Sequence, residues 1–154
     1  MAAVDGVVEQ IFIAPAEGDQ PAAVASVVAH AGRGLEGDRY LSPADRWIGS
    51  GRALTLIEAE AIDAVLAEHD LDLRDGRSRR QVVTRGIRLN DLVGMEFRAG
   101  ALRCRGVELC EPCLDLQRML GDPNTIKAMV HRGGLRADIL EGGRLSVGDA
   151  VAAP

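Results

Sequence analysis

The sequence predicts a mainly β protein (α+β): a closed or nearly closed β-barrel with two or three short helices, in a single domain over residues 1–154. Short runs in which apolar and polar residues alternate recur along the chain, which is the pattern of half-buried strands. Glycines separate many of these runs, as expected for turns and bulges. Barrel closure is favoured for so many short strands because it leaves few free strand edges.

The first half of the chain contains two predicted strands and one predicted helix. Residues 7–13 and 22–30 are short β-rich runs, separated by a loop at 14–21 that contains proline and glycine, and they predict an antiparallel pair. Residues 57–66 place apolar side chains on one face at helical spacing. This spacing predicts an amphipathic helix that ends near His69.

The second half is richer in predicted strands. Gly100 and Gly106 interrupt the period of two, which predicts a turn or a bulge at each. Asp122 followed by Pro123 is typical of a helix cap and a first helical residue, so a short helix is predicted through Met129. The strands are predicted at 81–84, 87–89, 95–98, 101–105 and 107–109, with a hairpin formed by 135–140 and 144–151.

Composition narrows the possible functions. The chain carries a formal net charge of −5, and aromatic residues make up only 3% of it. A negative net charge does not favour binding to the phosphates of a duplex, and few aromatic residues are available to stack on single-stranded bases. No nucleic-acid partner is therefore expected. Residues 1–15 lack the apolar run of a signal peptide or membrane anchor, and three cysteines, an odd number, favour reduced thiols. We therefore expect a cytoplasmic protein with no membrane partner.

Arginine is concentrated in the middle of this acidic chain. Between residues 74 and 105, nine arginines stand against three acidic residues. The guanidinium fork suits bidentate contacts with phosphate or carboxylate groups, although a solvated strand face is the alternative interpretation. Arg79 and Arg80 are adjacent, and neighbours on a strand face opposite ways. One of the two is therefore expected to point inward, and Arg79 is preferred.

A CxxC motif at 110–113 follows the arginine-rich segment. A soft thiolate beside guanidinium groups suits an anion with a thiophilic centre, and Cys113 lies where a strand is expected to end and a short helix to begin. A buried structural role is the alternative for Cys113 and the favoured interpretation for Cys110. Cys104 and His131, together with these two cysteines, also supply zinc-ligand types, but without the paired spacing of structural zinc sites.

Several motifs occur in an order that carries a family resemblance over roughly residues 5–152. They are 33–40 (RGLEGDRY), 56–58 (LIE), 79–87 (RRQVVTRGI), 110–113 (CEPC), 134–137 (GLRA) and 147–151 (VGDAV). In this order they resemble a MOSC domain, the β-barrel module found at the carboxyl end of molybdenum-cofactor sulfurases and in the amidoxime-reducing molybdenum enzymes.

The resemblance implies a site for the molybdenum cofactor (molybdopterin). In molybdenum-bearing relatives a cysteine at the end of this strand series ligates the metal, and arginines with backbone amides hold the pterin phosphate. The position that matches the metal ligand is Cys113. The implied cofactor-binding residues are Asp38, Arg39, Arg79, Arg80 and Arg136. Ordinary Gly-Asp turn chemistry is the alternative for Asp38.

The resemblance also implies a function, the reduction of N-hydroxylated compounds at the metal. Electrons would come from a separate flavin or iron–sulfur redox partner, because the chain has no motif for either group. One alternative is a non-catalytic sulfur carrier or cofactor-delivery module, which holds on Cys113 a persulfide received from a cysteine desulfurase. Another is a regulatory barrel that binds a small-molecule ligand and has an inert thiol.

Two departures from the family pattern bear on cofactor retention. Gln81 stands where family members often have asparagine. The amidoxime-reducing enzymes also commonly carry an additional amino-terminal domain, for which 154 residues leave no room.

Overall fold

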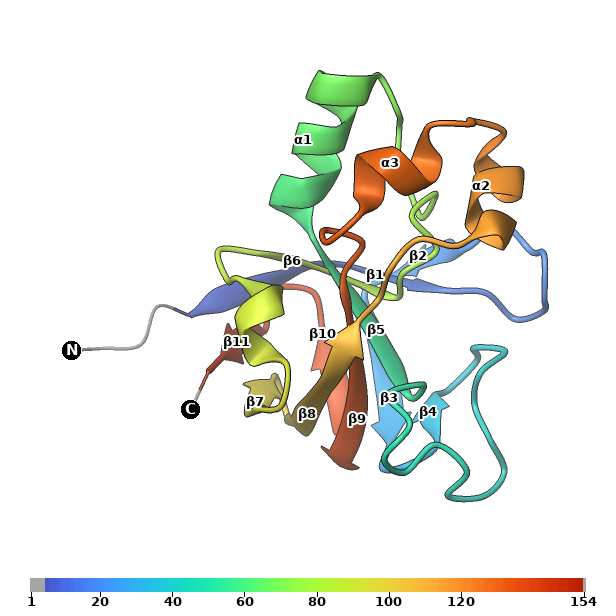
Figure 1. The fold of residues 1–154 in the computed structure, drawn as a ribbon. Coiled ribbons are helices and arrows are strands. Elements are labelled where there is room, and N and C mark those ends of the chain that lie inside the picture. The colour runs from blue at the N-terminus through green and yellow to red at the C-terminus, as the bar shows by residue number, and fades with distance from the viewer. Residues whose placement is uncertain (1–4, 154) are drawn as a thin grey trace.

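A computed structural model describes residues 5–153 and is built around a β-barrel (Figure 1). Its barrel strands are β1 (Gly6–Ile13), β5 (Leu54–Glu58), β6 (Val82–Arg85), β7 (Glu96–Ala99), β8 (Leu102–Leu109), β9 (Leu135–Glu141) and β11 (Ala150–Ala152). The remaining elements are β2 (Ala22–Val24), β3 (Ser26–His30), β4 (Gly34–Leu35), β10 (Gly143–Ser146), α1 (Ala59–His69), α2 (Leu114–Leu120), α3 (Thr125–Met129) and the 3₁₀-helix η1 (Leu89–Leu92).

The barrel is closed by hydrogen bonding all the way round. Its strands follow the order β11, β7, β8, β9, β5, β6 and β1, and β11 returns to pair with β1. Only β5 and β6 run parallel, while the other neighbours in the ring are antiparallel. β2 pairs with the far end of β1, as predicted, and β10, β3 and β4 form a second small sheet. The prediction of a closed, mainly β barrel with a few short helices is confirmed.

Two hydrophobic cores share the walls of the barrel. Alternate strand residues face opposite sides, so Leu56 and Val82 fill the barrel while Ile57 and Val83 face the helices. The three α-helices gather on one side of the barrel (Figure 1), and they enclose the second core with residues such as Ile62. Burial of each such side chain contributes about 1.5 to 3 kcal/mol.

The predicted helix at 57–66 exists but begins later than expected. Residues 54–58 form β5, and α1 begins at Ala59. Leu56 and Ile57 lie on opposite faces of one strand, each in its own core. A strand buried on both faces lacks polar alternation, so its apolar residues also fitted the helical period.

The predicted hairpin of 135–140 with 144–151 is wrong. β9 pairs with β8 and β5, whereas β10 pairs with β3. Gly142 allows this path, because a Cβ on it would lie 2.4 Å from the carbonyl oxygen of Ala29 in β3. The chain therefore crosses from the barrel to the second sheet at this glycine instead of folding back on β9.

Other boundaries also differ from the sequence prediction. Residues 22–30 divide into β2 and β3, 144–151 divide between β10 and β11, and 87–89 form no strand. The runs predicted at 101–105 and 107–109 belong to one continuous strand, β8, which begins at Leu102 and has a bulge next to Gly106, as the glycine indicated. The helix predicted from Pro123 begins at Thr125, because the carboxylate of Asp122 accepts a hydrogen bond from the amide of Asn124 and holds a turn there.

The strand register brings distant strand ends side by side. Leu56 of β5 pairs with Val82 at the start of β6 and with Leu135 at the start of β9. Val82 also pairs with Ile11 near the end of β1, and Leu135 pairs with Leu109 at the end of β8. The segments that precede or follow these strands therefore meet around a common opening.

Candidate functional site

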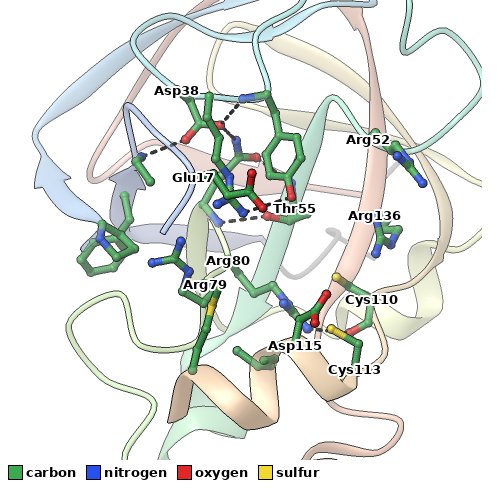
Figure 2. A pocket seen from close by; sticks show the side chains of 18 of the residues that line it. Glu17, Asp38, Arg52, Thr55, Arg79, Arg80, Cys110, Cys113, Asp115 and Arg136 are labelled. Carbon is green, nitrogen blue, oxygen red and sulfur yellow. Dashed lines mark hydrogen bonds between the residues drawn. The ribbon is translucent and has the colours of Figure 1, made fainter. Parts of the chain in front are cut away.

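A cavity of about 540 Å³ opens where these strand ends lie side by side (Figure 2). Its walls come from the end of β1, the loop after β4, the start of β5, the turn before β6, the segment from β8 into α2, and the start of β9. All six residues predicted as site residues line it: Asp38, Arg39, Arg79, Arg80, Cys113 and Arg136. The fold thus brings them together, and their contacts with a ligand remain a prediction.

The cavity is strongly biased towards positive charge. Six arginines line it against three carboxylates, in a protein whose net charge is −5. The arginines are Arg39, Arg52, Arg79, Arg80, Arg118 and Arg136, and the carboxylates are Glu17, Asp38 and Asp115. An anion is the ligand class that such a lining favours.

Asp38 is a buried structural hub. Its carboxylate accepts hydrogen bonds from the amides of Ala14 at 2.9 Å and Tyr40 at 3.2 Å, and from the side-chain amide of Gln81 at 2.9 Å. The Gln81 side-chain oxygen in turn accepts from the amide of Thr55 at 3.0 Å. Asp38 therefore ties the loop after β4 to β1 and, through Gln81, to β5, and only its bond from Tyr40 is a local turn contact.

Arg39 and Arg79 form one group on the wall of the cavity. Nη2 of Arg39 donates to the Tyr40 hydroxyl at 3.1 Å, but its Nη1 is buried with no partner. Nη1 of Arg79 donates to the carbonyl of Asp19 at 2.5 Å. Burial lowers the pKa of Arg79, and the nearby Arg39 guanidinium lowers it further. Because both guanidinium groups line the cavity, an anion beside them is favourable.

Arg80 is a clamp between two chain segments. Its Nε donates to the carbonyl of Gly133 at 2.8 Å and its Nη2 to the carbonyl of Cys110 at 3.1 Å. Gly133 is needed for this approach, because a Cβ there would lie 2.4 Å from the Cys110 carbonyl oxygen. Arg80 is buried, and it fixes the position of the thiol segment, as we call residues 110–113.

The expectation that strand alternation turns only one of Arg79 and Arg80 inward is wrong. They precede β6, and Arg79 has φ +62°, in the left-handed region that few residues other than glycine adopt. In this turn the backbone amide of Arg79 donates a hydrogen bond to the carbonyl of Gly76 at 3.0 Å. Strand alternation therefore does not apply, and both side chains line the cavity.

The three cysteines occupy different environments. Cys113 is exposed and is the N-cap residue of α2, at the end of the strand and start of the short helix that were predicted. Cys110 is buried but also lines the cavity. Cys104 lies inside the barrel, where burial raises its pKa to about 12. Among residues 5–153 no cluster of His, Cys, Asp or Glu could hold a metal by itself, so the zinc alternative with His131 is wrong.

Several lining residues were not singled out from the sequence. Arg52 and Arg118 are the main ones, with Tyr40 and Thr55. Arg52 precedes β5, a strand that the sequence pattern does not predict, and Arg118 lies on α2, whose residues it does not assign. No local sequence signal marks Arg52 as a lining residue.

No helix in the described part of the chain is long and apolar enough to cross a membrane.

The fold is similar to that of solved structures. They include the YuaD protein from Bacillus subtilis, with a TM-score of 0.82, 12% identity, and coverage of 97% of this chain and 96% of that one. YiiM from Geobacillus stearothermophilus has a TM-score of 0.74 at 14% identity, covering 97% and 75% of the two chains. YiiM from Escherichia coli has a TM-score of 0.69 at 17% identity, covering 100% and 70%. Likeness at such identities shows the fold alone.

Sequence comparison identifies the family. No curated protein matches the chain. The model of the MOSC domain matches residues 43–152, which include β5 to β11 and, within the cavity, the arginines before β6 and the thiol segment. Because this match spans more than half of the 154 residues, the chain belongs to the MOSC domain family.

Proposed function

We propose that the cavity binds the molybdenum cofactor or a sulfur species derived from it, with Cys113 as the metal ligand or sulfur carrier. The observation that carries the proposal is an exposed thiol within a cavity lined by six arginines. A thiolate is a soft donor that suits a metal with sulfur ligands, and guanidinium groups suit a phosphate.

The residues present fit such a group. A phosphate monoester carries about −1.5 to −2 charges at neutral pH. Arg39 and Arg79 supply positive charge, and the unpartnered Nη1 of Arg39 is a buried donor that lacks an acceptor. When bound, the cofactor would supply redox chemistry at molybdenum.

In this proposal the chain's own residues bind the cofactor phosphate and position the thiol segment. Arg39 and Arg79 would hold the phosphate, while Asp38 and Gln81 keep the loop that carries Arg39 against the barrel. Arg80 fixes the thiol segment through the Cys110 carbonyl. The activity we propose is reduction of N-hydroxylated compounds, with electrons from a separate redox partner.

A sulfur carrier is the second candidate, and the exposure of Cys113 favours it. A thiol at the surface end of α2 is open to another protein, such as a cysteine desulfurase that hands over one sulfur atom. In that role the chain holds a persulfide on Cys113 and delivers it without turnover of its own.

Removing the phosphate-holding charge is expected to empty the cavity. In protein made in a host that produces the cofactor, Arg39→Gln and Arg79→Gln should each lower molybdenum and pterin content by about tenfold, because each loses a charge-assisted contact worth about 1.5 to 3 kcal/mol. Elemental analysis and pterin fluorescence measure the two contents. Arg98→Gln, on β7 outside the cavity, is the charge-matched control. Full loading of both cavity variants would exclude this phosphate site.

Enzyme and carrier differ in turnover. As an enzyme, the cofactor-loaded chain should reduce an amidoxime repeatedly when an artificial one-electron donor replaces its partner. As a carrier, Cys113 should instead take one sulfur atom from a cysteine desulfurase, seen as a single persulfide mass shift. Turnover that survives removal of molybdenum would exclude the enzyme, and absence of both turnover and persulfide would favour a regulatory barrel.

A further inference from the structure

The cavity contains more arginine than one phosphate needs, and the arginines form separate groups. Arg39 and Arg79 interact with each other near Asp38. Arg52 and Arg136 lie on another side, the side of the thiol segment (Figure 2).

Backbone packing fixes this second pair beside the thiol segment. Gly51, next to Arg52, packs so closely on β9 that a Cβ there would lie 3.1 Å from Cβ of Arg136. The Gly51 amide also donates to Asp138 of β9 at 2.9 Å. Two residues before Arg136, the Gly134 carbonyl accepts the amide of Cys110 at 2.7 Å. Arg52, Arg136 and the thiol segment therefore share one end of β9.

These two guanidinium groups have little pairing within the protein. Among the described residues, the Arg52 guanidinium has no hydrogen bond or ion pair, and it lies 5.7 Å from the centre of the Trp47 ring. Arg136 has one long ion pair, in which its Nε lies 3.8 Å from the exposed Glu108 carboxylate, too far for a hydrogen bond. Two acidic residues lie two positions from Cys113 in the sequence. Arg118 pairs with Asp115 at 3.2 Å, and the Glu111 carboxylate accepts a hydrogen bond from the amide of His131 at 2.7 Å. Positive charge beside the thiol is thus left for a ligand.

We propose that the molecule that reacts at Cys113, or at a metal held by Cys113, carries a carboxylate or another oxyanion, which Arg52 and Arg136 bind. The inference rests on the proposed function in taking Cys113, or the metal that it would hold, as the place of reaction. It names a substrate class and a second anion subsite, distinct from the phosphate position at Arg39 and Arg79.

Alkylation of the metal-free, full-length chain tests this subsite without the cofactor. Iodoacetate is an anion and iodoacetamide is neutral, yet both react by the same step: the thiolate sulfur forms a bond to the CH₂ carbon and iodide leaves. Since both reagents need the thiolate, the ratio of their rate constants does not depend on how much thiolate is present. Peptide mass spectrometry confirms that the adduct is on Cys113, and Cys113→Ser supplies the blank.

The ratio of iodoacetate rate to iodoacetamide rate is expected to exceed that of free cysteine by about tenfold, as charge-assisted binding of the carboxylate implies. Arg52→Gln and Arg136→Gln should each lower the ratio about threefold or more, while Arg98→Gln leaves it unchanged. A ratio equal to that of free cysteine would overturn the inference. So would an equal fall in Arg39→Gln, because it would indicate a diffuse field in place of a local subsite.

Molybdenum and pterin contents separate this result from the proposed function. If the cofactor content is normal and the rate ratio equals that of free cysteine, the subsite proposal is wrong and the cofactor proposal stands. If the rate ratio is high and depends on the two arginines in a chain that never acquires cofactor, the subsite proposal stands and the cofactor proposal is wrong.

Discussion

Cys113→Ser is expected to abolish both bound molybdenum and cyanide-releasable sulfur while the fold stays intact. Changes around a metal ligand already cost about 10- to 100-fold in affinity, so loss of the ligand itself should cost more. The fold should tolerate the change because Cys113 is exposed and caps α2, a position at which serine is preferred. Elemental analysis, cyanolysis and urea unfolding measure the three properties.

Loss of a different thiol provides the control for this variant. Cys104→Ala removes a cysteine inside the barrel, so it should lower stability and leave the molybdenum content per folded chain unchanged. If Cys113→Ser keeps its metal and sulfur, neither the ligand role nor the carrier role holds.

Arg80→Ala is expected to have the largest effect on stability. It leaves the carbonyls of Gly133 and Cys110 without their charged donor, and each such loss costs about 1 to 3 kcal/mol. A total of about 3 kcal/mol lowers the Tm of a chain this size by about 6 to 12 °C. Calorimetry measures this change. The thiol segment should also lose its fixed position, seen as altered alkylation kinetics at Cys113.

Arg80→Lys distinguishes a clamp from a simple positive charge. Lysine keeps the charge but lacks the fork that reaches two carbonyls at once. The lysine variant should therefore be nearly as unstable as the alanine variant. Recovery of wild-type stability in Arg80→Lys would show that charge alone is what position 80 requires. Arg77→Ala, an exposed arginine nearby that pairs with Asp72, is the control.

Local patterns in the sequence predicted the kind of fold better than its pairings. Alternation marked β7 and β8, and Gly106 marked the bulge in β8, because these features arise within a few residues. The pairing of β10 with β3 depends on how Gly142 approaches Ala29, a contact between residues far apart in sequence. No local pattern contains that information.

The same distinction between local patterns and long-range contacts applies to the candidate site. The positions of Cys113 and the arginines followed from motif order, and all of the predicted residues line one cavity. The buried ties between Asp38 and Gln81 and between Arg80 and Gly133 could not be predicted, because each joins separate segments. Gln81 was noted only as a departure from the family, yet its side chain links the loop after β4 to β5.

The cavity depends on contacts between segments that are far apart in the sequence. Residues from Phe12 to Arg136 line the cavity, and the strand that closes the ring, β11, is at the carboxyl end. Contacts between such distant segments require long loops to be closed, which costs chain entropy. The complete cavity exists only when these segments have come together, so a ligand that contacts all of its walls binds the folded barrel.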